Sequence, residues 1–318
     1  MSDVCSLSPG SPLGHEFLDR GLGRGSLSTL QLFAGCVAIW GSTWLAITFQ
    51  LGRVAAEASV GWRFLLASFL LFAYCLARRL PLRYPPREHL WIAIQGLLMF
   101  SVSYIYVYYA EENVVSGLVA VGYSASPLLS MLGMRLFFRT PMTGAVIVGS
   151  ILGIAGIALV FWPEFAHLRG DRRTALGALY TAIAVIVSTL GTLAAHRNHE
   201  ARLPLWQGMA WGMLYGGLFS IAVTLAMGKA LAFDFSAPYV LSLVYLAMLG
   251  SVVAFAGYLT LLRRIGAARA GYIGVMVPIV ALVVSAVFEG FRWQALTVLG
   301  IAISVAGNVV VLRERARS

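Results

Sequence analysis

Charged residues are scarce in this chain of 318 residues. Only 11% of its residues are charged, 23 basic and 13 acidic, while 59% are hydrophobic. A soluble domain carries about 25% charged residues, which cover its water-facing surface. The composition therefore indicates a polytopic membrane protein whose main partner is the lipid bilayer. The net charge of +10 would suggest nucleic acid in a soluble protein, but the positive-inside rule explains it here, and we expect no nucleic-acid partner.

The sequence also lacks the motifs of common enzymes. The only lysine lies in Gly228-Lys229-Ala230 and not in a phosphate-binding loop, so the sequence does not predict ATP hydrolysis. His15-Glu16 is not followed by a second histidine at helical spacing, so it is no zinc-protease motif. The apolar runs contain no Ser/His/Asp arrangement. We expect no enzyme activity, no catalytic residues and no cofactor.

Metal-binding patterns are missing as well. The cysteines are odd in number and two of them lie in apolar runs, so they form neither a disulfide framework nor a metal-ligand spacing: Cys5, Cys36 and Cys75. His196 and His199 lie beside Glu200, where a solvated loop is a simpler interpretation than a metal site. We therefore expect no metal.

Ten apolar runs of about 19 to 24 residues follow one another, and each is long enough to cross a bilayer. The predicted spans are Thr29–Gln50, Ala58–Ala77, His89–Tyr109, Val115–Phe137, Thr143–Phe161, Thr174–Ala195, Leu205–Met227, Tyr239–Leu262, Arg269–Phe288 and Gln294–Leu312.

Basic residues are distributed unequally between the two sets of loops. Sixteen lie on the side of both termini and six on the other, with Arg63 inside a span. This bias places both termini in the cytoplasm of a cell inner (plasma) membrane. The loop after the fifth span opposes the pattern with three arginines. We expect a flexible cytosolic tail over 1–28, a periplasmic linker over 162–173 and a short cytosolic tail over 313–318.

An internal repeat relates the two halves of the chain. Near an offset of 151 residues, Val115–Phe161 matches Ala267–Leu312, with Pro127 on Pro278, Gly149 on Gly300 and Gly156 on Gly307. Glycines seven residues apart share one helix face, where another backbone can approach closely. Five spans per half is an odd number, so the halves, 29–161 and 174–312, insert in opposite orientations. The expected fold is an all-α polytopic membrane protein of ten transmembrane helices in two inverted five-helix repeats.

The chain resembles the EamA-like family of the drug/metabolite transporter superfamily over nearly its whole length. The residues that carry the resemblance are Trp40-Gly41-Ser42-Thr43, Arg63-Phe64-Leu65-Leu66-Ala67, Tyr109-Ala110, Ser116-Gly117-Leu118, Pro127, the Gly149–Gly153–Gly156 run, Gly266-Ala267-Ala268-Arg269-Ala270, Pro278, Glu289 and Gly300–Gly307. The family often has a glutamate after the fourth span too, where this chain has Phe138. The resemblance implies a ten-helix carrier of the inner membrane that exports amino acids or other small metabolites.

Arg63 is the most informative single residue, because it lies several residues inside the second predicted span. A charge inside a membrane costs on the order of 2.5–3.5 kcal/mol on insertion scales and needs compensation. Glu111 and Glu112 end the third span at the same face, so we predict an ion pair of Arg63 with one of them. Glu289 lies near the same face and is a further ion-pair or gating candidate. A structural role for Arg63, with its head group reaching the interface, fits the sequence equally well.

Aromatic pairs at helical spacing form a candidate substrate cavity. Most pairs taken alone fit ordinary packing, but together they would make apolar walls with polar groups for small amphipathic solutes or cations. With Thr43 and Arg63, the candidates are Trp40, Trp44, Tyr104, Tyr108, Trp211 and Tyr215. Pro127 and Pro278 each leave a backbone carbonyl without its helical donor, and we predict helix kinks there.

These features predict a secondary transporter that moves a small-molecule substrate by alternating access, with export of amino acids or similar metabolites favoured. A multidrug or cationic-compound efflux carrier, a passive channel and a lipid-handling protein of the same architecture remain alternatives. A repeat of five plus five helices can form a pathway within one chain, so a monomer is the default, and a dimer is compatible with the sequence.

Overall fold

The computed structural model describes residues 27–139, 142–166 and 172–315. The predicted tails and the centre of the predicted linker lie largely outside these ranges. Over the described ranges the secondary structure is helical. The elements are α1 (Thr29–Thr48), α2 (Ala56–Ala77), α3 (Pro86–Leu97), η2 (Leu98–Val102), α4 (Ser103–Glu111), α5 (Ser116–Tyr123), α6 (Ser126–Phe138), α7 (Gly144–Ala166), α8 (Arg172–Glu200), α9 (Leu205–Ala226), α10 (Ala237–Val244), η3 (Tyr245–Val253), α11 (Ala254–Ala270), α12 (Tyr272–Phe288) and α13 (Ala295–Arg315).

Eight helical stretches of the described chain are long and apolar enough to cross a membrane. Two further apolar helices, Gly144–Val160 and Tyr272–Phe288, are shorter. Large apolar side chains remain exposed along the outside of the bundle, including Phe69, Leu136 and Val287 at 67–72% of their area. Such a surface fits lipid rather than water. The chain is therefore an all-α polytopic protein, with helices at all ten predicted positions.

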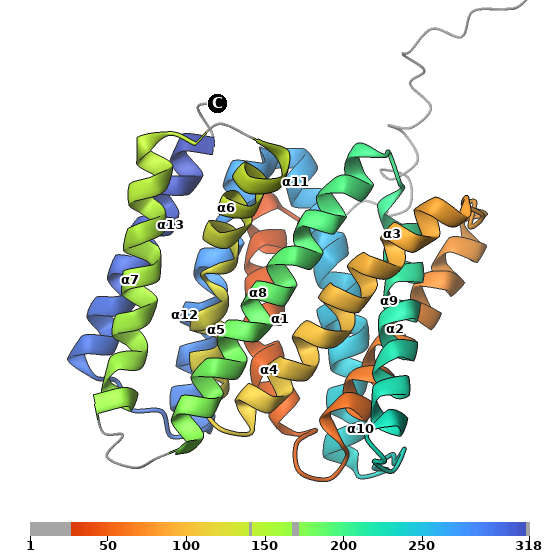
Figure 1. Cartoon of the computed structure of the whole chain (residues 1–318), viewed down its shortest axis with the longest axis horizontal. Coiled ribbons are helices and arrows are strands. Elements are labelled where there is room, and N and C mark those ends of the chain that lie inside the picture. The colour runs from red at the N-terminus through yellow and green to blue at the C-terminus, as the bar shows by residue number, and fades with distance from the viewer. Residues whose placement is uncertain (1–26, 140–141, 167–171, 316–318) are drawn as a thin grey trace, which may run out of the picture.

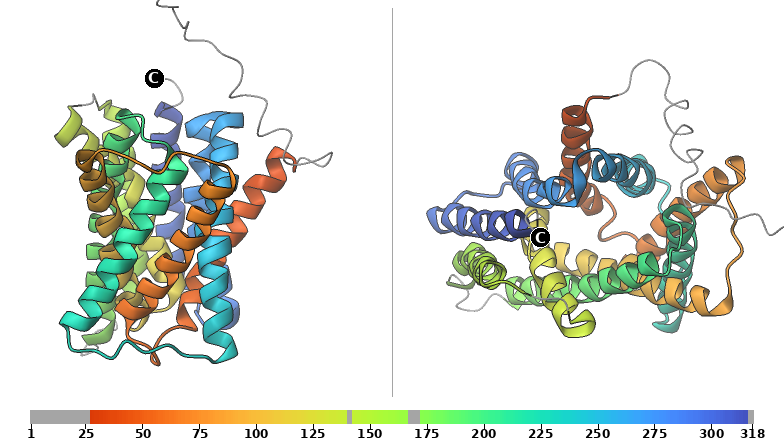
Figure 2. Two further views of the ribbon diagram at one scale, coloured as in Figure 1. Left: turned by 90° about the vertical axis from the view of Figure 1, so that its right-hand side faces the viewer. Right: turned by 90° about the horizontal axis from the view of Figure 1, so that it is seen from above.

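The two ends of the bundle differ in what they contain. The first helix begins and the last helix ends at the same end, which we call the termini end (Figures 1 and 2). At the opposite end, which we call the far end, α4 ends, α5 begins and α10 begins (Figure 1). Helices of the first half pack directly on helices of the second, as α2 does on α9, α1 on α12 and α7 on α13. Sites between these helices are therefore built from both halves.

Several spans are interrupted rather than continuous. A π-helical turn, η2, separates α3 from α4, and a longer one, η3, separates α10 from α11. The fourth predicted span breaks between α5 and α6, and Pro127 lies in the first turn of α6. The predicted kink at Pro127 is thus a helix break, whereas α12 continues past Pro278. Because proline has no N–H, each site leaves a carbonyl one turn earlier without its usual donor.

The repeated glycines allow α7 and α13 to approach closely. A Cβ added at Gly149 would meet the carbonyl oxygen of Gly307, and one at Gly156 would meet the backbone of Gly300 and Ser304. The two helices that carry the repeated glycine pattern are thus each other's partners. The sequence predicted the close approach, and the structure identifies the partner helix.

Replacing Gly156 by alanine should destabilise this contact. The added methyl group has backbone atoms in its way, so the helices must separate, which costs about 1–3 kcal/mol in a packed core. The melting temperature in detergent should fall for Gly156→Ala. Gly35→Ala is the matched control, because a Cβ at Gly35 meets nothing within 4 Å. Equal melting temperatures for the two variants would contradict this packing.

Candidate functional site

A cavity of about 740 Å³ lies between helices of both halves. At the termini end its lining reaches Met134, His196, Gly271 and Leu312. Toward the far end its lining extends to the level of Arg63, Tyr104 and Val107. The remaining lining residues are Trp40, Thr43, Trp44, Ile47, Ala120, Tyr123, Ser126, Pro127, Ser130, Ser188, Thr192, Leu193, Phe255, Tyr258, Ala270, Ile273, Gly274, Val277 and Pro278. The volume suits a small metabolite.

Arg63 provides a positive charge at the end of this cavity that is nearest the far end of the bundle. It lies two turns into α2 and is only 3% exposed. Its guanidinium carbon is 4.5 Å from the ring centroid of Tyr104 and 5.1 Å from that of Phe64. These cation–π contacts attract the charge but use none of its N–H groups. Its Nε and Nη1 atoms have no hydrogen-bond partner among the described residues, so Arg63 retains donors for a bound anion.

The predicted ion pair of Arg63 with Glu111 or Glu112 is wrong. The described residues contain no such pair: both oxygens of Glu111 are buried without a hydrogen-bond partner, and Glu112 is exposed. The guanidinium of Arg63 packs instead on the rings of Phe64 and Tyr104, and Tyr104 precedes Glu111 by two turns of α4.

Glu289 accepts hydrogen bonds from serine residues and forms no ion pair among the described residues. It is the residue after α12, and its Oε1 accepts from the N–H of Ser116 at 3.1 Å while Oε2 accepts from the Ser116 hydroxyl at 2.5 Å. The Ser285 hydroxyl also donates to Oε2. Glu289 therefore caps the first turn of α5, where the helix dipole favours a negative charge. This contact joins the two halves at the far end.

The tryptophans of α1 line the cavity, and local contacts fix their positions. Trp40 packs on Phe255 and Tyr258, with ring centroids 5.2 and 5.6 Å away. Its Nε1 donates to the carbonyl oxygen of Gly250 at 3.0 Å. Gly250 lies in the π-helical turn η3, whose altered hydrogen-bond pattern favours such outside donors. Trp44 packs on Tyr123 at 5.1 Å, so both indoles are held in place before any substrate binds.

Three of the proposed cavity residues lie elsewhere. Tyr108 is fully buried and donates to Oε1 of Gln50 at 2.6 Å. Trp211 donates to the carbonyl oxygen of Leu82 at 3.0 Å, and the Tyr215 hydroxyl is 2.8 Å from His89 Nδ1. Both α9 aromatics face α3 and the loop before it because α9 packs there, so their predicted place on the cavity is wrong. Trp40, Thr43, Trp44, Arg63 and Tyr104 do line it.

A buried ion pair at the far end was missed by the sequence analysis. Glu57 lies in the first turn of α2, is 0% exposed, and pairs with Lys229 Nζ at 2.8 Å. The Tyr109 hydroxyl also donates to Glu57. We call Glu57, Tyr109 and Lys229 the far-end lock, because they tie α2 and α4 of the first half to the loop after α9. Glu57 precedes the predicted span Ala58–Ala77 by one residue, so the prediction did not include it. The one sequence feature that could have pointed to this pair is Lys229, the single lysine of the chain.

A second contact supports the lock on the surface of the far end. Arg53 pairs with Asp234 at 3.2 Å, and Trp62 Nε1 donates to the carbonyl oxygen of Ala232 at 3.0 Å. The N–H and hydroxyl of Ser236 donate to Asp234, at 2.8 and 2.7 Å. These bonds, with Arg53 nearby, hold the pKa of Asp234 below its usual range, so it remains ionised for Arg53. The loop after α9 is thereby fixed against α2.

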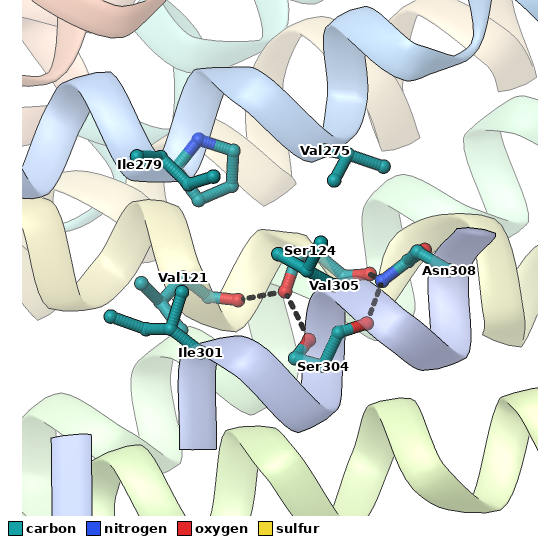
Figure 3. A pocket seen from close by; sticks show the side chains of 9 residues that line it. Val121, Ser124, Val275, Ile279, Ile301, Ser304, Val305 and Asn308 are labelled. Atoms are coloured by element: carbon teal, nitrogen blue, oxygen red, sulfur yellow. Dashed lines mark hydrogen bonds between the residues drawn. The ribbon is translucent and has the colours of Figure 1, made fainter. Parts of the chain in front are cut away.

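A small polar cluster stabilises the break between α5 and α6. Ser124 Oγ donates to the carbonyl oxygen of Val121 at 2.6 Å and lies 3.3 Å from Ser304 Oγ (Figure 3). Asn308 Nδ2 donates to the carbonyl oxygens of Ser124 and Ser304, at 3.4 and 3.1 Å (Figure 3). Asn308 of the second half therefore binds a carbonyl oxygen at the break in the first. Pro278 lines both the small pocket beside this cluster and the main cavity.

Known proteins resemble the chain over most of its length. The profile of the EamA-like transporter family matches residues 27–162 and 175–313. A protein of Escherichia coli K12 described as the uncharacterized inner membrane transporter YedA is 31% identical over 86% of this chain and 90% of its own length. A probable terminal-alkyne amino-acid exporter of Streptantibioticus cattleyicolor is 27% identical over 70% of this chain and 72% of its own.

A solved structure resembles the fold. One crystal structure covers 90% of this chain and 98% of its own, with a TM-score of 0.65 at 17% identity. At that identity the likeness concerns the fold alone. The family match extends over both halves and includes the helices that form the cavity. The chain belongs to the EamA-like transporter family.

Proposed function

We propose that the protein is a secondary transporter that works by alternating access. The observation that carries this proposal is a cavity whose lining reaches the termini end but not the far end, where contacts join the two halves. An aqueous channel would need a path at both ends. The structure then represents the conformation that faces the termini end, and breaking the far-end contacts would give the opposite one.

The proposed architecture is ten transmembrane helices in two inverted five-helix repeats. Support comes from the sequence repeat, from the odd number of spans in each half and from the mutual packing of the repeated glycines. In this proposal both termini are cytoplasmic, so the cavity faces the cytoplasm. A relative is named an inner membrane transporter, which supports the inner membrane as the location.

The proposed substrates are amino acids or similar small metabolites, and the proposed direction is export. Arg63 lines the end of the cavity and has two donor atoms without a hydrogen-bond partner, which suits a carboxylate. The rings of Trp40, Trp44 and Tyr104 offer apolar surface for the rest of a small molecule. One relative is named a probable amino-acid exporter. A buried guanidinium repels cations, which makes cationic-compound efflux the weaker alternative.

Counterflow in proteoliposomes tests this proposal. Vesicles are preloaded with one unlabelled amino acid at a time and then given a trace of the same amino acid in radiolabelled form, with polyamines and quaternary amines as a second panel. A carrier gives transient accumulation that saturates with concentration. Flux without saturation or exchange would identify a channel, and counterflow only with the cationic panel would assign the protein to cation efflux.

A further inference from the structure

Glu111 is a buried carboxyl group that the proposed transport cycle has not yet used. It ends α4 and is 7% exposed, and neither of its oxygens has a hydrogen-bond partner in the described part of the chain. Tyr104, Val107 and Glu111 lie at helical spacing along one side of α4. Tyr104 and Val107 line the cavity, so Glu111 lies one turn beyond its closed end.

The charged groups around Glu111 come from two other elements. Arg63 on α2 and Glu289 after α12 both act on it electrostatically. Glu289 accepts two hydrogen bonds from Ser116 at the start of α5 and one from Ser285 of α12. From α8, which packs on α4, the charged residues of this end are exposed: Arg172 and Arg173.

The neighbouring residues do not supply a charge partner either. Glu112, next on the chain, is exposed and interacts with Glu57 and Lys229 of the far-end lock. Tyr108, one turn earlier, donates its hydroxyl to Gln50. Arg63 is therefore the cation that acts on Glu111, and the two groups form no ion pair.

The ionised form of Glu111 is disfavoured in this conformation. A buried carboxylate without hydrogen bonds loses its hydration and gains nothing in return. The negative charge of Glu289 adds repulsion, since two nearby carboxylates do not ionise together without cost. Arg63 opposes both effects, but it lies over Tyr104 and out of hydrogen-bonding contact. The neutral carboxylic acid fits the site better than the carboxylate.

We propose that Glu111 is a proton-binding site whose occupancy controls the opening of the far end. This inference rests on the proposed alternating access. With the far end closed, Glu111 holds its proton. When the far end opens, water reaches the carboxyl group, its O–H bond breaks and the proton passes to that water, leaving a carboxylate that faces Arg63. Closing the far end again requires the carboxylate to take a proton back.

The coupling has a definite sign. Because the closed far end binds the proton and the open far end releases it, acid favours the conformation in the structure and alkali favours the opposite one. One proton changes the ratio of the two conformations by up to about tenfold per pH unit. This change is confined to the pH range between the proton affinities of the two conformations.

Infrared difference spectroscopy of the purified full-length protein tests the proton site directly. At neutral pH the wild type should show the carbonyl band of a protonated carboxylic acid, and Glu111→Gln should lose it. Glu112→Gln is the matched control and should keep the band, because Glu112 is exposed. An unchanged band in Glu111→Gln, or no such band in the wild type, would overturn the proposal. Should Glu111→Gln fail to fold, Glu111→Asp keeps a carboxyl group and should shift the band.

Thiol labelling tests the coupling to conformation. A single cysteine introduced by Val107→Cys is exposed to an impermeant maleimide on the far side over a range of pH. At each pH the labelling rate of Val107→Cys is divided by the labelling rate of Val107→Cys that also carries Glu111→Gln. We expect this ratio to rise with pH. A ratio that does not change with pH would contradict the coupling of Glu111 to the conformation. Absence of counterflow for every compound tested would overturn the transporter proposal but not the proton site. The infrared band decides separately whether Glu111 holds a proton.

Discussion

Replacing Arg63 by methionine is expected to abolish most transport without lowering the stability of the protein. Methionine preserves much of the side-chain length but removes the charge and the donors that Arg63 leaves unused. Charged hydrogen bonds to a ligand are worth about 1.5–3 kcal/mol, so transport of a carboxylate substrate should fall roughly 10- to 100-fold. Initial rates of counterflow, normalised to protein content, measure the loss.

The melting temperature separates a binding role from a structural one. A buried charge without a full set of partners is costly, and its replacement by an apolar group is often neutral or stabilising. Arg63→Met should therefore melt at the same temperature as the wild type or higher. Arg83→Ala is the control, because Arg83 is exposed and both properties should be unchanged. A lower melting temperature with normal transport would assign Arg63 to structure alone.

Removing Lys229 is expected to shift the protein toward the conformation that is open at the far end. Glu57 is completely buried, and without Lys229 its charge has only the Tyr109 hydroxyl as a partner. Breaking a fully buried pair costs about 3–5 kcal/mol. Lys229 is 37% exposed, so we discount this to about 1–2 kcal/mol. The ratio of open to closed far ends should rise about tenfold in Lys229→Ala.

A double-mutant cycle isolates the lock from other effects of the substitutions. Labelling of Val107→Cys from the far side is compared in four backgrounds: unmodified, Lys229→Ala, Glu57→Gln and both together. If the ion pair closes the far end, the double variant should label no faster than the faster single variant. Additive effects, or unchanged labelling in Lys229→Ala, would show that this pair does not hold the far end closed.

The part of the cavity formed by α1 and Arg63 was predictable from the sequence, because it follows from helix periodicity and from position within a span. Trp40, Thr43 and Trp44 recur at helical spacing on one helix, and Arg63 is conspicuous as a charge inside an apolar run. For the pair Trp211 and Tyr215 the same periodicity was misleading. Spacing shows that two residues share a face, but it does not show which neighbour covers that face, and here α3 covers it.

The far end could not be predicted from the sequence for two physical reasons. Glu57 adjoins the boundary of an apolar run, and such boundaries are uncertain by a few residues, so its burial was invisible. Its partner Lys229 is 172 residues away, and no local pattern links them. The pair of Arg63 with Glu111 was predicted from the positions of span ends, which indicate depth in the membrane. Span ends do not show that the guanidinium packs on the rings of Phe64 and Tyr104.

The central claim is that one cavity is reached alternately from the two sides of the membrane. Val107→Cys, in a chain carrying Cys5→Ser, Cys36→Ala and Cys75→Ala, places a single thiol at the closed end of that cavity. An impermeant maleimide is applied to one side of sealed vesicles at a time. Alternating access predicts labelling from either side while the vesicles remain impermeable to the reagent. Labelling from the termini side alone, with none from the far side even in Lys229→Ala, would contradict it.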